Sequence, residues 1–544
     1  MSRRPLLGAG LALLLVLAGT LLWTRPWRAE GGHPAACAGV TVRAGDDLGR
    51  AVASHPAGTT FCLGAGEHRL ASAVPKDGQR FVGEGEKTRL SGARVLEADA
   101  ARRDAAGRWY WTGQTQEGRP HGVLIGPGHA EVPNPGDAYP EELFVTSSSD
   151  PGDAPERLRR VTKLAEVGRG TWYLDQAADR IYLAENPARL GLVETSVTPA
   201  AIAVPPGRRA TGVVVSQLVI EKYASPTQQA ALGGAGAVDW TLHRLTVRYN
   251  HGAGAELGPG TLMEGSKVHH MGQEGLIGGG DAERRPTVLR DTEVAWNKAL
   301  TFDPDWEAGG TKFTRVYGKG MVVENCWFHH NAGAGLWFDM DNHNVVVRSN
   351  RFQANDRWGI FYEVSRGAKI YWNEALGTGN GPENYLFAGA GIFVANSADV
   401  EVYENVLDGN HNGILVTEDR QATRWGEQSF RDGLPHVEGV DIHDNDVRML
   451  DGVTGMRVEN GDATAYWRPD NVRFAANTYR FDGGERFMGA GNQSYTFDEW
   501  RRLGNDRDGQ GLSALSRGTL PLGATAFSMR PYGATTAGEG SPGS

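Results

Sequence analysis

The stretch Val322–Leu336 reads VVENCWFHHNAGAGL, and the stretch Val346–Phe361 reads VVRSNRFQANDRWGIF. Each has alternating apolar residues, then Asn, another apolar position, a second Asn and a Gly that precedes a further apolar pair. The same pattern recurs over Ile370–Gly381 and Val400–Leu415. The chain is therefore repetitive in this region. The asparagines that match between the copies are Asn325, Asn350, Asn373, Asn405 and Asn445.

These asparagines are separated by 25, 23, 32 and 40 residues, which indicates a period near 24 with insertions. So short a unit cannot bury its own apolar face, so its copies must stack into a solenoid. Leucine-rich repeats need an L-x-x-L-x-L pattern, which is absent. Asn tolerates left-handed backbone at corners and can stack its amide into a ladder. We therefore expect an all-β fold, a right-handed three-stranded parallel β-helix.

Outside the repeat, the composition of the chain changes along its length. We expect a signal peptide or N-terminal membrane anchor at 1–30, followed by an N-terminal cap and the first coils at 37–100. Strand-like segments at 101–200 predict an inserted β-rich subdomain. The main β-helix is expected at 201–515 and a flexible Gly/Ala/Ser-rich tail at 516–544.

The overall composition excludes some classes of protein. Of 544 residues, 40% are hydrophobic and 22% are charged, so the chain can bury a core and is not disordered as a whole. Glycine is abundant at 75 residues, which favours short strands and many turns. The formal net charge is −10, which argues against a nucleic-acid partner.

The N-terminus carries the features of an export segment. Arg3 and Arg4 precede Leu6–Trp23, an uncharged run whose length lies between a signal peptide and a membrane-spanning helix. We expect the protein to be extracellular, or anchored through this run to the outer face of the cytoplasmic membrane.

The chain has three cysteines, and none shows the spacing of a zinc site, so we expect no metal centre. Outside the cell, Cys37 and Cys62 could form a disulfide that closes a short N-terminal loop. Cys326 lies in an apolar stretch and is expected to be a buried, inert thiol.

Two neighbouring copies of the repeat bring acidic residues into register. The segments Gly335–Asp341 and Gly359–Ser365 are offset by 24 residues, one coil. Because strand side chains alternate between faces, one set should point into the coil and the other outward. The predicted inward set is Leu336, Phe338 and Met340 with Ile360, Tyr362 and Val364. The predicted outward set is Trp337, Asp339 and Asp341 with Phe361, Glu363 and Ser365.

Asp339 and Glu363 would then lie side by side on adjacent strands, which stack about 4.8 Å apart. Two carboxyl groups roughly 5 Å apart have the spacing of a retaining glycosidase. They cannot both ionise cheaply, so one would remain charged as the nucleophile and the other protonated as the general acid. The alternative interpretation is that these acids are merely solvated, or bind calcium.

Other residues around this pair could bind substrate. Lys312 aligns with Trp337 and could bind a sugar hydroxyl or tune the nucleophile. Asp341 is a candidate supporting residue or alternative catalytic acid. Each also has a structural interpretation, as a surface, solvated or core residue. The expected substrate-binding set is Trp306, Glu307, Lys312, Trp337, Asp341, Trp358 and Phe361.

The Asn-rich coils, with Leu336–Asp339 and Ile360–Ser365, resemble the secreted right-handed β-helix proteins of the pectate-lyase-like superfold. More narrowly, they are similar to glycoside hydrolase family 120, the β-xylosidases with a β-helix. That family has a Trp-x-Asp strand followed about one coil later by a Phe-x-Glu-Val strand. The resemblance implies that Asp339 is the nucleophile and Glu363 the acid/base.

The sequence thus predicts an extracellular, retaining glycoside hydrolase with a carbohydrate substrate and no organic cofactor. Two alternatives remain open. One is a polysaccharide lyase or uronate epimerase, in which Lys312 and an acidic loop with calcium would neutralise the sugar carboxylate. The other is a non-catalytic, glycan-binding β-helix at the cell surface.

Overall fold

The computed structural model describes most of the chain between its terminal segments. The residues described are 37–121, 134–147, 154–381, 389–419, 426–449, 452–458, 471–489 and 492–514. The expected leader at 1–30, with Leu6–Trp23, and the expected tail at 516–544 lie outside them. In the described part, none of the helices has the length and hydropathy needed to cross a membrane.

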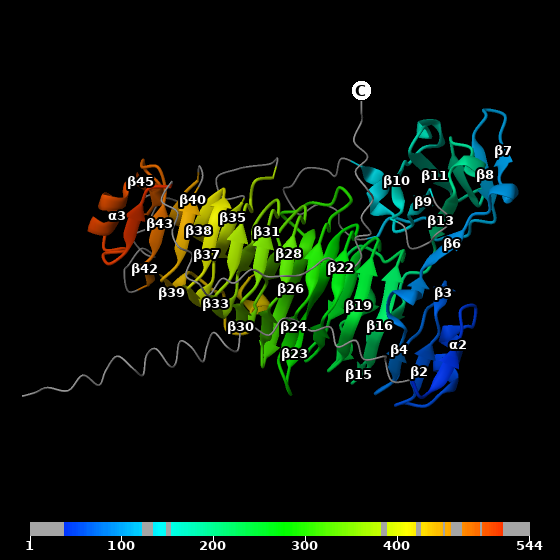
Figure 1. Cartoon of the computed structure of the whole chain (residues 1–544), viewed down its shortest axis with the longest axis horizontal. Helices are drawn as coiled ribbons and strands as arrows, with labels where there is room; N and C mark the ends of the chain where they lie inside the picture. The colour runs from blue at the N-terminus through cyan, green and yellow to red at the C-terminus, as the bar shows by residue number, and fades with distance from the viewer. Residues whose placement is uncertain are drawn as a thin grey trace, which may run out of the picture. The chain divides into compact units, whose positions relative to one another are not determined.

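The described chain forms a parallel β-helix, in which each coil adds one strand to each of three stacked rows (Figure 1). The row that matters for function is a separate sheet of 12 strands. Its strands are β14 (Ile202–Ala203), β17 (Ala230–Gly233), β20 (Ala253–Leu257), β23 (Glu274–Ala282), β26 (Gly309–Gly318), β29 (Leu336–Asp339), β32 (Ile360–Glu363), β35 (Ala390–Ala395), β38 (Asn412–Glu418), β41 (Thr454–Val458), β44 (Phe487–Met488) and β45 (Ser494–Tyr495).

The other two rows are joined into one sheet of 24 strands, because β16 (Val214–Glu221) and β19 (Thr241–Arg248) run through both. The second row adds β1 (Val40–Val42), β2 (Thr60–Leu63), β4 (Arg80–Val82), β21 (Leu262–Glu264), β24 (Thr287–Arg290), β27 (Met321–Glu324), β30 (His343–Arg348), β33 (Arg366–Tyr371), β36 (Ala398–Tyr403), β39 (Glu438–His443) and β42 (Val472–Ala475). The third adds β3 (Gly66–Arg69), β5 (Thr88–Ser91), β22 (Lys267–His269), β25 (Glu293–Ala295), β28 (Trp327–His329), β31 (Arg351–Gln353), β34 (Glu374–Leu376), β37 (Val406–Asn410), β40 (Asp446–Met449), β43 (Thr478–Arg480) and β46 (Gln510–Leu512).

The core of the β-helix consists of inward side chains stacked from coil to coil. Phe313 packs on Phe338 with ring centroids 5.5 Å apart, and Phe338 packs on Tyr362 at 6.1 Å. Phe328 and Phe352 form a stacked pair at 4.9 Å. Burial of this continuous apolar row is what holds each otherwise unstable coil to its neighbours.

A buried asparagine ladder follows one corner of the coils. Asn350 donates from Nδ2 to Asn373 Oδ1 at 3.0 Å, and Asn373 donates to Asn405 Oδ1 at 3.0 Å. The ladder continues through Asn445 to Asn477. The predicted ladder is confirmed except at its first position.

Cys326, not Asn325, occupies that first position. The backbone N–H of Cys326 donates to Asn350 Oδ1 at 2.9 Å. Asn325 is the left-handed turn residue that precedes it, with φ of 55°. The thiol of Cys326 is buried, as expected, and burial raises its pKa.

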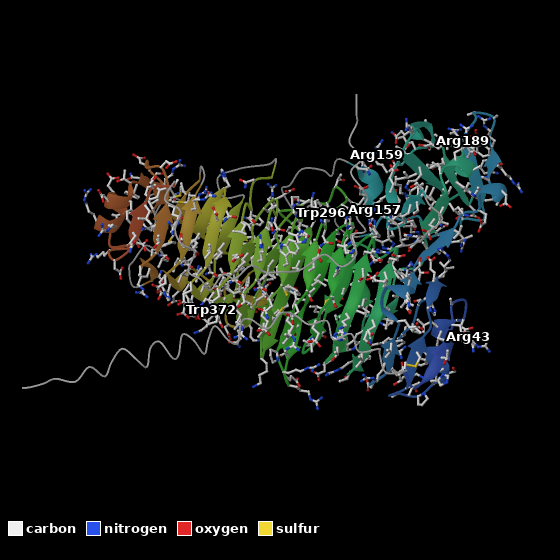
Figure 2. The ribbon with its side chains drawn as sticks, viewed as in Figure 1. Arg43, Arg157, Arg159, Arg189, Trp296 and Trp372 are labelled. Atoms are coloured by element: carbon white, nitrogen blue, oxygen red, sulfur yellow. A yellow bond between two sulfur atoms is a disulfide. The ribbon has the colours of Figure 1, made fainter. Side chains whose placement is uncertain are left out.

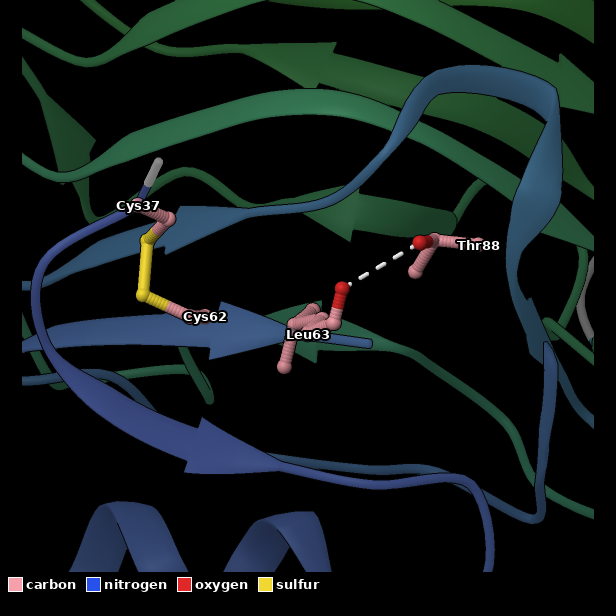
Figure 3. The surroundings of a disulfide bond; sticks show 4 residues. All are labelled: Cys37, Cys62, Leu63 and Thr88. Carbon is pink, nitrogen blue, oxygen red and sulfur yellow. Dashed lines mark hydrogen bonds between the residues drawn. A yellow bond between two sulfur atoms is a disulfide. The ribbon is translucent and has the colours of Figure 1, made fainter. Parts of the chain in front are cut away.

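Each end of the solenoid is capped by a short helix. At the N-terminal end, α2 (Leu48–Ser54) begins at Asp47, whose side chain accepts from Arg50 N. The predicted disulfide joins Cys37 to Cys62 beside it, with Cα atoms 5.7 Å apart (Figure 3). At the C-terminal end, α3 (Phe497–Arg502) buries Trp500 against the last coils.

A second, eight-stranded sheet is inserted between β5 and β14. Its strands are β6 (Ala93–Val95), β13 (Leu192–Ser196), β9 (Leu143–Thr146), β10 (Glu156–Arg160), β11 (Thr171–Asp175), β12 (Arg180–Leu183), β8 (Trp109–Thr112) and β7 (Arg102–Arg103). This subdomain has its own core around Trp172. Arg157 on β10, which is labelled in Figure 2, donates to the backbone carbonyl of His270 on the coils at 3.3 Å. The inserted sheet is thus tied directly to the β-helix.

Candidate active site

The two acidic residues predicted to form a pair end neighbouring strands of the 12-stranded sheet. In β29 and β32, Trp337 pairs with Phe361, and Phe338 pairs with Tyr362. Asp339 and Glu363 are the next residues of the two strands. The register of one coil per 24 residues is therefore confirmed at this position. It places the two carboxyl-bearing residues side by side on the outer face.

The chain bends directly after this pair. Met340 and Asp341 have φ of 61° and 65°, and Val364 has φ of 46°. Alternation therefore stops, and Met340 and Val364 do not point into the coil. They pack instead against Phe430. The prediction that both belong to the inward row is wrong, because the strands end one residue earlier than the apolar pattern indicates.

Lys312 is the cation of the site. Its Nζ lies 3.0 Å from Asp339 Oδ2 and donates to the carbonyl oxygen of Trp306 at 2.5 Å. The same ammonium lies 3.9 Å from the ring centroid of Trp337, within the range of a cation–π interaction. Burial alone would lower the pKa of Lys312, but the surrounding carboxyl groups raise it above its ordinary value, and Asp339 contributes most. Lys312 is therefore a fixed positive charge.

Glu363 is outward-facing, but it is not exposed as expected. Its relative exposure is 1%, whereas the side chain of Asp339 is 16% exposed. Trp337 donates from Nε1 to Glu363 Oε2 at 3.0 Å. Burial and the adjacent Asp339 raise the pKa of Glu363 well above its ordinary value, against the opposing influence of Lys312. The two carboxyl groups thus differ: Asp339 is ion-paired, and the pKa of Glu363 is raised.

An aromatic cluster forms one side of the site. Trp337 stacks on Phe361 with ring centroids 5.1 Å apart. The ring centroid of Phe361 lies 4.3 Å from that of Trp358 and 4.8 Å from that of Phe393. All four rings are buried, so Trp337, Trp358 and Phe361 pack mainly on one another. Phe393 was not predicted, although it occupies the same outward position one coil after Phe361. Among the predicted aromatic residues, Trp306 is the one that is only partly buried.

Trp306 and Glu307 lie in a loop between β25 and β26 that is anchored on several sides. Glu307 accepts from Gln228 through its side chain, and its backbone carbonyl accepts from Gln273 Nε2 at 2.8 Å. At the start of the loop, Thr301 donates from its backbone N–H to Asp137 of the inserted subdomain at 2.9 Å. The subdomain therefore helps to fix the loop that carries two predicted substrate-binding residues.

Asp341 does not face an open site. It is buried and accepts from Tyr317 Oη at 2.6 Å, from His343 Nε2 at 2.9 Å and from the backbone N–H of Arg431 at 2.7 Å. Burial raises the pKa of Asp341, but these hydrogen bonds outweigh it and the net pKa is lowered. Asp341 thereby anchors the segment 426–434, which we call the strap, near the ends of β29 and β32.

Glu274, an acidic residue at the start of β23, was not among the predicted site residues. It pairs in register with Gly309, and Gly309 forms a bridge with Ala334. Glu274 contributes to the field that raises the pKa of Lys312. The repeated glycines that follow these positions, Gly275, Gly310 and Gly335, are the signal that could have aligned it with the site.

Within the described ranges, no group of three or more His, Cys, Asp or Glu side chains is arranged to hold a metal ion.

Comparisons with known proteins agree with this architecture. A family model described as a right handed beta helix region matches residues 231–424. No match was found among curated proteins. The structure of XylC in complex with xylose is similar with a TM-score of 0.50 and 11% identity, and the match covers 80% of each chain. These findings show that the fold is a right-handed parallel β-helix.

Two further solved structures match at lower scores. One is a glycoside hydrolase, with 11% identity, coverage of 85% of this chain and 90% of that chain, and a TM-score of 0.37. The other is the A-module of the mannuronan C-5 epimerase AlgE4 from Azotobacter vinelandii, with 12% identity, coverage of 86% and 90%, and a TM-score of 0.37.

Proposed function

We propose that the protein is an extracellular glycoside hydrolase that acts on a polysaccharide or oligosaccharide and retains the anomeric configuration. The observation that carries this proposal is the unequal carboxyl pair. Asp339 is ion-paired with Lys312, while the neighbouring Glu363 is buried and has a raised pKa. A charged carboxylate beside a protonated carboxylic acid is the arrangement that a double displacement needs.

In the first step, an Asp339 oxygen attacks the anomeric carbon, and the bond to the leaving oxygen breaks. Glu363 gives its proton to that oxygen, so the leaving sugar departs as a neutral alcohol. In the second step, Glu363, now a carboxylate, takes a proton from water. The resulting hydroxide equivalent attacks the anomeric carbon and releases Asp339, so Glu363 regains its proton.

Lys312 and Trp337 would control how charge moves during these steps. Lys312 stabilises the carboxylate of Asp339 before attack and again when it leaves. Trp337 donates a hydrogen bond to Glu363 Oε2, which stabilises the carboxylate formed when Glu363 loses its proton. Neither residue would need to move, because both are already in contact with the pair.

The charges at the site favour a neutral sugar over a uronic acid. A lyase or epimerase acting on uronates must neutralise the sugar carboxylate. Here Lys312 is already engaged by Asp339 and by the carbonyl of Trp306, and Glu307 adds a second carboxylate nearby. A uronate at this position would meet more negative than positive groups, so we rank the lyase and epimerase alternatives lower.

The narrower hypothesis is a β-xylosidase of the family 120 type. It rests on the resemblance of β29 and β32 to the two strands of that family, and on the likeness of fold to XylC, whose structure contains xylose. Export is proposed from Arg3, Arg4 and Leu6–Trp23. The Cys37–Cys62 disulfide supports it, because such bonds persist in oxidising compartments.

The proposal is tested by assaying the wild type on a panel of neutral aryl glycosides and on oligosaccharides, alongside Asp339→Asn. Asp498→Asn on the exposed surface of α3 is the matched control. We expect hydrolysis by the wild type and the control, and a loss of several orders of magnitude in Asp339→Asn. Equal hydrolysis by all three proteins would refute the mechanism. Binding of glycans without any product would favour the non-catalytic alternative.

A further inference from the structure

Glu274 lies on the outer face of the sheet, in the row that leads to the candidate site. Its partners across successive strands are Gly309 and then Ala334. Ala334 packs with Trp337 and Trp358 in the outer aromatic cluster, so this row faces outward. Gly309 has φ of 152°, and a Cβ there would lie 2.9 Å from the carbonyl oxygen of Ala334. The position next to Glu274 therefore carries no side chain.

Among the described residues, none forms a hydrogen bond with the carboxyl group of Glu274. The residue is 1% exposed, and within the described part of the chain neither of its carboxyl oxygens has a hydrogen-bond partner. Leaving a buried polar group unpaired costs a few kcal/mol, so such groups are rare in folded proteins. Two other buried carboxylates are paired: Glu194 binds Lys222 at 2.5 Å, and Glu141 binds Arg160 at 2.6 Å.

The described groups around Glu274 do not supply a counter-charge in contact with its carboxyl group. Its pKa is raised well above the ordinary value, first by burial and then by Glu307, and Lys312 opposes this only in part. The nearby ammonium of Lys312 is directed to Asp339 and Trp306. The raised pKa favours the protonated form of Glu274. This form offers one O–H donor and one carbonyl acceptor.

We propose that Glu274 is a substrate-binding residue whose carboxyl group binds a hydroxyl group of a neutral sugar ring. A sugar hydroxyl both donates and accepts, so it satisfies both halves of the acid at once. An apolar ligand would leave the acid unpaired, and an anionic sugar would face the negative field of Glu307 and Asp339. The inference rests on the proposed function, since it takes the surroundings of Asp339 and Glu363 as the place where the sugar binds.

Three variants test this role. Glu274→Met removes the hydrogen-bonding group at similar length, Glu274→Gln keeps one donor and one acceptor, and Glu438→Met is the same change at an exposed position. The substrates are an aryl glycoside that the wild type hydrolyses and its monodeoxy derivatives. We expect the wild type to lose about tenfold or more in kcat/KM on one monodeoxy derivative, because a buried group is then left unpaired.

On the parent glycoside, the kcat/KM of Glu274→Met should be lower than that of the wild type by a similar factor. The variant should hydrolyse that one monodeoxy derivative as well as it hydrolyses the parent. Glu274→Gln should recover part of the loss, and Glu438→Met should behave as the wild type. If Glu274→Met discriminates among all derivatives as the wild type does, the role of Glu274 is refuted.

Thermal unfolding separates a binding role from a structural one. Removing an unpaired buried acid should relieve a cost, so we expect the Tm of Glu274→Met to equal or exceed that of the wild type. A clear fall in Tm would show that Glu274 has structural partners and would overturn the proposal.

Failure of the proposed function would be seen separately, as an absence of glycoside hydrolysis by the wild type. In that case the same sugar and its monodeoxy derivatives are measured as free ligands by calorimetry. Weaker binding to Glu274→Met, with loss of discrimination at one hydroxyl, would still support the role of Glu274. Equal binding to both proteins, or binding to neither, would refute it.

Discussion

Lys312 forms its ion pair with Asp339, although the residue opposite it on the neighbouring strand is Trp337. Asp339 is opposite Thr314, two residues further along, so the lysine reaches diagonally across the face of Trp337. The indole in turn donates its N–H to Glu363. The indole of Trp337 thus contacts both the ammonium that pairs with Asp339 and the carboxyl group of Glu363. This arrangement gives the two carboxyl groups different surroundings.

Replacing Lys312 by Met should strongly destabilise the protein. The ammonium is the counter-charge for Asp339 and lies in the field of Glu307, Glu274 and Glu363. Removing one partner of a buried ion pair costs about 3–5 kcal/mol of the free energy of unfolding. The loss should grow as the pH rises, because ionised carboxylates then have no counter-charge.

Chemical denaturation of Lys312→Met, Asp339→Asn and the double variant measures this coupling. The double variant should be less destabilised than the sum of the two single variants. Strict additivity would show that the ion pair contributes nothing to stability.

Replacing Glu363 by Gln should reduce hydrolysis most for poor leaving groups. Loss of a general acid costs about 10²–10⁴-fold in rate, but activated aryl leaving groups need less protonation. The raised pKa of Glu363 means that the wild type should stay active above the ordinary glutamate range and lose activity as the pH rises through that raised value.

The pH profile of kcat/KM for alkyl and aryl glycosides checks this prediction, with the exposed Glu438→Gln as control. The fall in kcat/KM at high pH should be absent from Glu363→Gln. If that fall persists unchanged in the variant, it is caused by the titration of another group.

Much of the fold was predictable because a solenoid repeats its physical constraints in each coil. The spacing of 24 residues between Gly335 and Gly359 gave the strand register, and the structure confirms it in the pairing of Trp337 with Phe361. Where the chain departs from the repeat, the prediction failed. Asn325 and Cys326 show this, because a shift of one residue at a corner changes which side chain enters the ladder.

The site was less predictable than the fold, since burial depends on residues distant in sequence. Alternation correctly placed Glu363 on the outer face, but it gave no sign that packing would leave it almost fully buried. Met340 was misassigned because a left-handed turn ends the strand at that residue. Glu274 was not predicted because its coil has no acidic residue at the position that Asp339 and Glu363 occupy in their coils.

Asp341 should control how tightly the strap is held. Asp341→Asn replaces one of two acceptor oxygens by a donor, so at least one of the bonds from Tyr317, His343 and Arg431 is lost. Each hydrogen bond to a charged group contributes about 1.5–3 kcal/mol. Because the pKa of Asp341 is lowered, this stabilisation is present above the ordinary Asp range and is lost as the pH falls through the lowered value.

Tryptic cleavage after Arg431 at neutral pH measures the opening of the strap. It should be faster in Asp341→Asn than in the wild type. Glu438→Gln, a change at an exposed position outside the strap, should leave the rate unaltered. Equal cleavage of all three proteins would show that Asp341 does not anchor the strap.

The asparagine ladder should be sensitive at its centre and tolerant at its first position. Asn373→Ala removes donors to Val347 O and Asn405 Oδ1, which would cost about 1–3 kcal/mol of the free energy of unfolding. Cys326→Asn should be neutral or stabilising, because its amide can donate to Leu289 O, which the thiol already approaches at 3.6 Å. Urea denaturation of both variants checks this, and a larger loss for Cys326→Asn than for Asn373→Ala would contradict it.

The central hypothesis is that Asp339 attacks the anomeric carbon of the sugar. The direct measurement is to incubate the protein with a 2-deoxy-2-fluoro glycoside carrying a good leaving group, and to map the modified peptide by mass spectrometry. We expect one glycosyl group, attached to the peptide at Asp339 and absent from Asp339→Asn. Turnover of the parent glycoside with an adduct on another residue, or with inversion and no adduct, would contradict it.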